Sequence, residues 1–364
     1  MSEHQGAFAS TPSPAKKAYY RVNFTGQGGE YFKIWIVNIA LTIVTLGIYS
    51  AWAKVRTRQY FYNNTLINNT SFQYHGEPLA ILKGRIIAVI LFVLYSFAVH
   101  SLPIIAVPTF LIFLAALPWI VMRALAFNAR MTSFKGVRFN FNANYTQTLQ
   151  IVLLWPILLV FTLGLIFPLV KHKYYEFVAK HMKFGTSEFA YQGKISEMFI
   201  IYLIAMAISA GITTVMVLIG VVFAGVAGLA SGLEDASGVM LWLASSGITL
   251  FIVFYIALNL VIWAFIQAKT VNLIFNNLTL GDNRFYADLN FSQVAIIQFT
   301  NTLAIIFSLG LAYPWAAIRM TRYRTTCIQV IAADDLDNIT AEQVAKLGAV
   351  GDEAAEVFDL DLAF

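Results

Sequence analysis

The chain has 364 residues, of which 59% are hydrophobic and only 12% are charged, and its formal net charge is +5. Soluble proteins carry about twice that share of charged residues. The mean hydropathy of +0.70 therefore excludes an ordinary soluble enzyme and indicates a membrane protein. The single cysteine, Cys327, excludes an intramolecular disulfide, and no Cys/His cluster has the spacing of a metal site.

Two polar ends enclose a long apolar region. Residues 1–23 predict a disordered N-terminal tail, and residues 24–332 predict a membrane domain. Two apolar pairs within that domain, 86–127 and 198–267, are long enough to form transmembrane hairpins. Residues 333–364 carry nine acids against one base, Lys346. This composition predicts an acidic cytoplasmic tail.

Three similar segments recur between and around these hairpins. A shift of 117 residues superimposes residues 24–76 on 141–193, and a shift of 263 adds a third copy at 285–327. Each copy has an apolar helix, a break made of a hydroxyl residue, leucine and glycine, and then a basic aromatic stretch. The predicted breaks are at Gly47, Gly164 and Gly310, followed by Pro168 and Pro314 in the second and third copies.

Basic residues flank both ends of every repeat helix, and the positive-inside rule then places both ends in the cytoplasm. This pattern favours four spans plus three re-entrant or interfacial segments. Seven ordinary spans remain an open alternative. The expected fold class is an all-α polytopic membrane protein with three internal repeats of broken helices and two transmembrane hairpins, to which short cytoplasmic strands are added.

The basic residues after the breaks are the candidate lipid sites. They are expected to hold anionic lipid head groups, or only to set topology. These residues are Lys54, Arg56, Arg58, Lys171, Lys173, Arg319 and Arg322.

The uncharged helix centres argue against an ion-coupled transporter. Asn38 and Asn301 occupy matching repeat positions and predict either a polar interior path or hydrogen bonds between helices. No set of acid, base and nucleophile converges, so we expect no catalytic residue, no metal and no cofactor, and nucleic acid is not an expected partner.

The most specific stretches of the first repeat run from Phe24 to Glu30, from Thr45 to Arg56, and from Phe72 to Gly76. In these stretches the sequence resembles the YjgN family, which carries the bacterial domain of unknown function 898. The resemblance covers nearly the whole chain and implies a multi-pass protein of the bacterial inner membrane. It supplies no substrate.

We therefore expect a non-enzymatic pore, carrier or lipid-associated transport protein of the inner membrane, with its C-terminus in the cytoplasm. The alternative is a structural or assembly protein of the cell envelope with cytoplasmic docking surfaces. Expected partners are membrane lipids, including anionic ones. A second copy of the chain, or a cytoplasmic protein bound through the acidic tail, remains open.

Overall fold

The computed structural model describes residues 17–101, 103–230 and 237–333, together with a few residues between 338 and 345. Within these residues a strand, two antiparallel helical arms and a second strand follow one another five times. The predicted acidic tail after residue 345 and most of the predicted N-terminal tail lie outside the described residues. Strand β1 begins at Ala18, inside the range predicted as that tail.

The five strand–hairpin–strand units follow in chain order. The first is β1 (Ala18–Phe24), α1 (Gly28–Val44), α2 (Ser50–Asn63) and β2 (Thr65–Ile67). The second is β3 (Thr70–Tyr74), α3 (Pro78–Ser101), α4 (Pro103–Arg130) and β4 (Thr132–Phe134). The third is β5 (Val137–Phe141), then α5 (Tyr145–Leu149), the π-helical turn η1 (Gln150–Leu154) and α6 (Trp155–Phe161) as one arm, α7 (Phe167–His181) and β6 (Met182–Phe184). The fourth is β7 (Ser187–Tyr191), α8 (Ile195–Ala230), α9 (Ser237–Asn276) and β8 (Leu278–Leu280). The fifth is β9 (Asn283–Ala287), α10 (Phe291–Phe307), α11 (Tyr313–Thr326) and β10 (Ile328–Ala332).

The ten strands in the described part of the chain close into one antiparallel barrel. The first strand pairs with the last, with Ala18 opposite Ala332, and its other edge pairs with β2, with Phe24 opposite Thr65. Tight turns join β2 to β3, β4 to β5, β6 to β7 and β8 to β9. All five helical hairpins therefore leave from one end of the barrel, and the tight turns lie at the other end.

Apolar side chains fill the barrel. One cluster of packed side chains draws residues from all ten strands, including buried Phe134, Val137 and Phe184. Aromatic rings contact one another across it: the centroids of Phe72 and Phe134 are 4.9 Å apart, and those of Phe139 and Phe184 are 5.0 Å apart. The barrel is thus a packed core, as expected where inward-facing side chains occupy a small barrel, and not an open channel.

The expectation of an all-α fold is wrong. Short strands are expected at the ends of the repeats, but only as an addition to a helical protein. They are instead the closed barrel from which every hairpin starts. The strands are only three to seven residues long, so their alternation is brief beside the long apolar helices.

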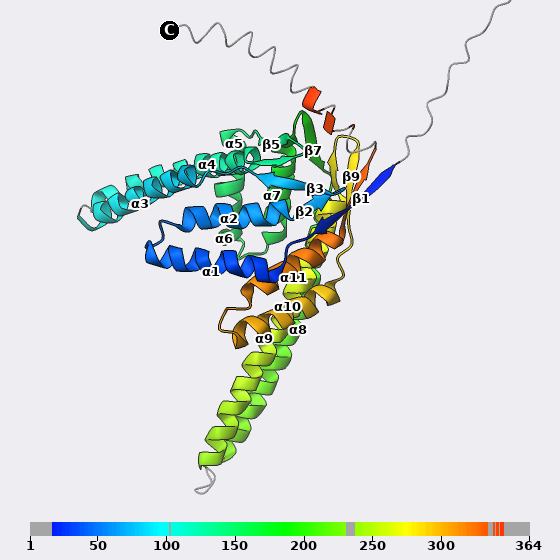
Figure 1. Cartoon of the computed structure of the whole chain (residues 1–364). Helices are drawn as coiled ribbons and strands as arrows, with labels where there is room; N and C mark the ends of the chain where they lie inside the picture. The colour runs from blue at the N-terminus through cyan, green and yellow to red at the C-terminus, as the bar shows by residue number, and fades with distance from the viewer. Residues whose placement is uncertain are drawn as a thin grey trace, which may run out of the picture.

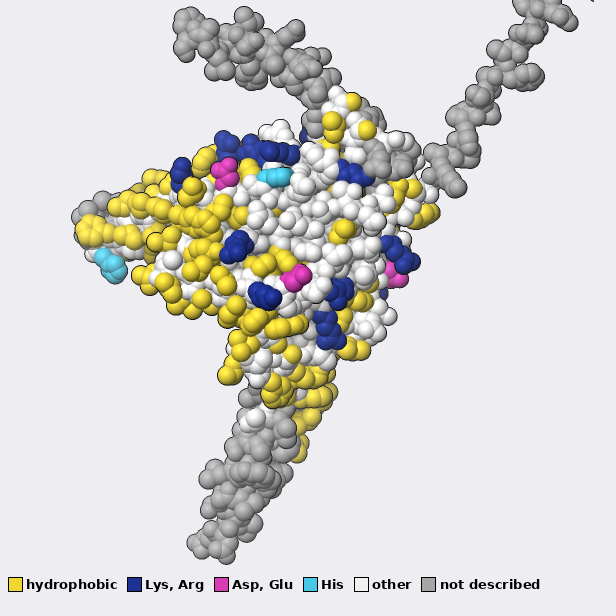
Figure 2. Space-filling view, in the orientation of Figure 1, with side chains coloured by type: hydrophobic (Ala, Val, Ile, Leu, Met, Phe, Trp, Pro, Cys, Tyr) yellow, Lys and Arg dark blue, Asp and Glu magenta, His cyan; other side chains and the backbone are white. Residues whose placement is uncertain are grey.

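Four helical segments in the described residues are long and apolar enough to cross a membrane: Pro78–Phe97, Val107–Arg130, Ile195–Val222 and Val253–Asn276. They form the hairpins α3–α4 and α8–α9, which extend away from the barrel in Figure 1. Few of their side chains are buried within the chain. Figure 2 shows hydrophobic side chains over α3 and α4, whereas lysine and arginine side chains lie nearer the barrel.

The other three hairpins are shorter but also carry exposed apolar side chains at their tips. Leu46, Leu163 and Leu309 are each more than nine-tenths exposed. Neighbouring residues at these tips, including Val44, Phe161 and Phe307, are exposed as well, and contiguous apolar surface of this kind is costly in water. The hairpins of all five units therefore present apolar surface on the side of the barrel from which the helices leave.

Candidate functional site

A groove of about 520 Å³ lies between α1, α2 and α3. Its polar wall includes Lys54 and Arg58 from α2 and Arg85 from α3, and we call it the basic groove after these three residues. Trp35, Ile39 and Ile43 from α1 line it as well. The groove therefore combines positive charge with an apolar wall, which suits a ligand that has an anionic part and an apolar part.

The basic groove carries three positive charges, and none of them forms an ion pair within the described residues. Arg58 donates to the hydroxyl of Tyr74 at 3.0 Å and also contacts the side-chain oxygen of Asn128. Arg85 donates to the hydroxyl of Ser50. The ion pairs formed among described residues lie elsewhere, between α7 side chains and between β6 and β7.

The neighbouring positive charges affect the pKa of Lys54. Burial lowers the pKa of its ammonium below the usual value, and the positive charges of Arg58 and Arg85 lower that pKa further. An anion among the three side chains would remove the repulsion, because opposite charges at short distance favour the charged form. The groove is thus electrostatically prepared for an anionic ligand.

Asn38 adds a buried polar group to the same groove. Its side chain is 5% exposed, and its amide nitrogen donates to the carbonyl of Ala53 in α2 at 3.4 Å. Its oxygen, Oδ1, is buried and accepts no hydrogen bond from any described group. The hydrogen bond joins the two helices of the first hairpin, while the oxygen is left as an unused acceptor.

The matching region between the third and fourth units carries aromatic side chains where the basic groove carries charged ones. Helices α3 and α8 begin 117 residues apart, at Pro78 and Ile195, which is the offset that relates the first two predicted repeats. At this offset Trp155 replaces Asn38, Tyr175 replaces Arg58 and Tyr202 replaces Arg85. Only the lysine is kept, because Lys171 matches Lys54.

Lys171 has a partner in this aromatic region. It donates to the hydroxyl of Tyr202 at 2.9 Å, and its ammonium lies 5.6 Å from the centre of the same ring. Such cation–π contacts satisfy a lysine without an anion. The concentration of positive charge is therefore specific to the basic groove and is not a general consequence of the hairpin architecture.

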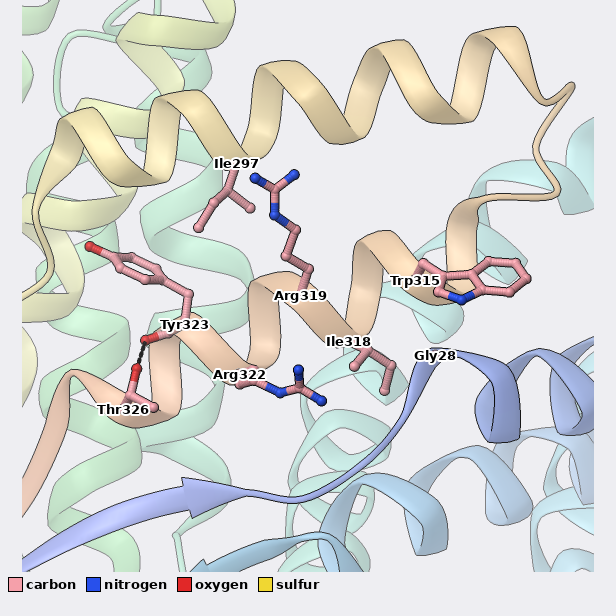
Figure 3. A pocket seen from close by; sticks show the side chains of 8 residues that line it. All are labelled: Gly28, Ile297, Trp315, Ile318, Arg319, Arg322, Tyr323 and Thr326. Carbon is pink, nitrogen blue, oxygen red and sulfur yellow. Dashed lines mark hydrogen bonds between the residues drawn. The ribbon is translucent and has the colours of Figure 1, made fainter.

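A second cavity, of about 530 Å³, lies between α10, α11 and the start of α1 (Figure 3). It brings together the predicted residues Arg319 and Arg322. Arg319 donates to the hydroxyl of Thr300 at 2.7 Å, and Arg322 donates to the carbonyl of Gly26 at 2.8 Å. Both arginines thus join helix α11 to neighbouring elements.

The remaining predicted basic residues lie outside both cavities. Arg56 donates to the hydroxyl of Tyr49 at 2.9 Å, and Lys173 forms an ion pair with Glu176 at 2.8 Å. The predicted set of seven is therefore divided. Lys54 and Arg58 share the basic groove, Arg319 and Arg322 share the second cavity, and Arg56, Lys171 and Lys173 have local partners.

The three predicted break glycines occupy equivalent turns between the helices of the short hairpins. Their φ angles are +92° at Gly47, +87° at Gly164 and +93° at Gly310, a region that favours glycine. In each turn the glycine amide donates to a carbonyl five residues earlier, at 2.7 to 2.9 Å. This bond ends the first helix as in a Schellman motif.

Pro168 and Pro314 lie in the first turns of α7 and α11, and both are buried. A proline is tolerated at this position because its missing amide would have no partner within the helix. These two residues therefore begin the second helix of their hairpins, while the glycines make the turn.

Asn301 repeats the helix-joining contact of Asn38. Its amide nitrogen donates to the carbonyl of Ala316 in α11 at 3.0 Å. Unlike Asn38, it also has a donor to its oxygen, because Arg319 lies 3.4 Å from its Oδ1. Of the two interpretations of these asparagines, hydrogen bonding between helices describes Asn301 fully and Asn38 only in part.

Sequence reasoning missed Arg85 as a member of the site. Arg85 lies within an apolar segment long enough to cross a membrane, seven residues after Pro78, and Arg123 lies at a similar distance from the end of the segment Val107–Arg130. A charged residue in such a segment is a functional candidate in its own right, and this signal was available. The described residues contain no group of three His, Cys, Asp or Glu side chains able to hold a metal.

Sequence comparison finds relatives over most of the chain. The inner membrane protein YjgN of Salmonella typhimurium is 27% identical over 367 aligned positions, which cover 87% of this chain and 89% of that protein. The YjgN protein of Escherichia coli O157:H7 is 34% identical over 150 positions, covering 40% of this chain and 36% of that protein. No solved structure matches.

The family resemblance predicted from the first repeat is confirmed. A family described as bacterial protein of unknown function, DUF898, matches residues 19–357, a span that includes the five hairpins and every strand residue except Ala18. The chain belongs to this family.

Proposed function

We propose that this chain is a non-enzymatic, multi-pass protein of the bacterial inner membrane that binds anionic phospholipid in the basic groove. The observation that carries the proposal is the convergence of Lys54, Arg58 and Arg85, without an acidic partner in the described residues, beside the apolar wall made by Trp35, Ile39 and Ile43. A phospholipid supplies both the anion and the apolar chain that these two surfaces require.

The position of the groove along the helices supports a lipid ligand. Arg85 lies seven residues after the start of α3, which is about 10 Å along a helix. It is therefore near the base of a membrane-length hairpin, where the head-group region would lie. A long basic side chain at such a depth extends its charge toward the polar region of the bilayer.

The connections between barrel and helices support an orientation. Both ends of α3–α4 and of α8–α9 return to the barrel, so each hairpin would cross the membrane twice and leave the barrel on one side. Basic residues lie near that side, and the positive-inside rule assigns it to the cytoplasm. The C-terminal residues follow β10 and would be cytoplasmic too.

The packed barrel argues for lipid binding over a pore through the barrel axis. Phe134, Phe139 and Phe184 pack together inside it, and water or a polar solute would have to displace these rings. No such rearrangement is needed for a lipid to enter the basic groove from the side.

Binding of phosphatidylglycerol and phosphatidylcholine to the purified full-length protein in detergent, measured by native mass spectrometry, tests the proposal. We expect phosphatidylglycerol to bind more tightly. Lys54→Gln should weaken it about fivefold, since one basic residue near an anionic lipid is worth roughly 1 kcal/mol. Arg56→Gln is the matched control, because Arg56 lies on the same helix but outside the groove.

Inorganic phosphate distinguishes a lipid from a free anion. Millimolar phosphate should not displace phosphatidylglycerol, because phosphate makes no use of the apolar wall. Equal weakening by Lys54→Gln and Arg56→Gln would show general surface charge instead of a site, and complete displacement by phosphate would make the ligand a soluble anion. Either result contradicts the proposal.

A further inference from the structure

The unused acceptor in the basic groove indicates which head group fits, given the proposed lipid binding. Asn38 Oδ1 is buried and receives no hydrogen bond in the described part of the chain. An acceptor withdrawn from water without a donor is costly. A ligand that brings a hydrogen-bond donor as well as a negative charge would therefore match both features of the groove.

The second matched asparagine shows that the missing donor is specific to Asn38. In the α10–α11 hairpin, Asn301 donates to Ala316, and its Oδ1 is 3.4 Å from a donor on Arg319. The residue at the position of Arg319 in the first hairpin is Arg56, and it donates to Tyr49 instead. The same helix-joining contact is therefore fully satisfied in one hairpin and incomplete in the other.

Nearby hydroxyls are already committed. The hydroxyl of Thr42 donates to the backbone carbonyl of Asn38 at 2.6 Å, and the hydroxyl of Ser50 donates to the carbonyl of Gly47. Neither hydroxyl donates to Asn38 Oδ1, and a hydroxyl on the ligand would supply the donor. An ammonium group, as in phosphatidylethanolamine, would be repelled by three neighbouring cations, whereas a neutral hydroxyl would not.

We propose that the basic groove selects phospholipids whose head group carries a hydroxyl, of the phosphatidylglycerol class. The phosphate lies against Lys54 and Arg85, and a head-group hydroxyl donates to Asn38 Oδ1. Asn38, Lys54 and Arg85 all line the groove, so a single head group can contact all three residues.

Phosphatidylmethanol is the probe that isolates the hydroxyl, because it has the charge and phosphate diester of phosphatidylglycerol but no head-group hydroxyl. Both lipids, with the same acyl chains, are titrated separately into the full-length protein in detergent. One net hydrogen bond corresponds to a preference of about threefold to tenfold for phosphatidylglycerol. Asn38→Leu should abolish this preference.

Asn301→Leu is the matched control, because it removes the same contact between helices at a position outside the groove. It should keep the wild-type preference. The inference is overturned if wild-type protein binds the two lipids equally, a result that needs no variant to fold, or if Asn38→Leu keeps the preference. If wild-type protein bound neither lipid, that result would instead refute the proposed function on which this inference rests.

Discussion

Gly28 and Trp315 are packed so closely that a Cβ added to the glycine would lie 2.2 Å from Cδ1 of the indole. Gly28 begins α1, and Trp315 lies in the first turn of α11 (Figure 3). The same indole contacts Phe32, with 5.0 Å between ring centroids. The first and last hairpins of the chain therefore meet at a glycine.

Gly28→Ala should lower the stability of the protein, because the indole must move and lose its contact with Phe32. Overpacking of this kind costs about 1 to 3 kcal/mol. Gly29→Ala is the control, because an added Cβ at Gly29 meets nothing within 4 Å. Thermal unfolding in detergent, followed by tryptophan fluorescence, would contradict the prediction if the two variants had the same midpoint.

Gly47→Ala should also be destabilising, but through the backbone. The φ angle of +92° at Gly47 is strained for alanine, at about 1 to 3 kcal/mol. Gly84→Ala provides the comparison, because Gly84 is helical and has open space around its Cα. We expect a lower unfolding temperature for the first variant and little change for the second. A Gly47→Ala protein as stable as wild type would show that the turn relaxes easily.

Single cysteines in a Cys327→Ser background test the proposed orientation. Asn63 and Lys180 are exposed residues in the last turns of α2 and α7, near the barrel, whereas Ser237 begins α9 at the far end of the longest hairpin. In cells whose outer membrane has been removed and whose inner membrane is intact, an impermeant thiol reagent should label Ser237→Cys alone. Asn63→Cys and Lys180→Cys should be labelled only after lysis. Labelling of either one before lysis would exclude a cytoplasmic barrel.

Phosphatidylglycerol binding should weaken at alkaline pH. The pKa of Lys54 is lowered by burial and by Arg58 and Arg85, and a bound phosphate would raise it again. The affinity is then full below the pKa of the free protein and falls as the pH rises above it, at pH values where an ordinary lysine, of pKa near 10.5, is still charged. Lys54→Arg should remove the fall, because arginine stays protonated. Titrations between pH 7 and 10 would refute the role of Lys54 if both proteins lost affinity in parallel.

The sequence predicted the helical hairpins better than the barrel, for a physical reason. Long apolar runs are visible over some 20 residues, whereas a strand such as β2 or β4 has three residues and shows hardly one period of alternation. The turn residues Asn68 and Asn69, which both adopt positive φ, are a signal for a tight hairpin. That signal marks a pair of strands, but it does not say that ten strands close on themselves.

The basic groove was only partly predictable. Lys54, Arg58 and Asn38 stood out because they belong to the first repeat, but their association with Arg85 depends on the β2–β3 turn, which brings α3 back beside α2. The spacing of residues in the sequence does not show how closely α3 approaches α2. The unused oxygen of Asn38 is likewise invisible in the sequence, because it depends on which way Arg56 points.

The pairing of β1 with β10 has a consequence for biosynthesis. The partner of Ala18 is Ala332, so more than three hundred residues must leave the ribosome before the N-terminal strand can acquire its second neighbour. Until then the nascent chain holds two unpaired strand edges, which are prone to pair with other chains. All five hairpins are therefore synthesised before the sheet can close, and a product truncated before Ile328 would keep an unpaired edge on strand β1.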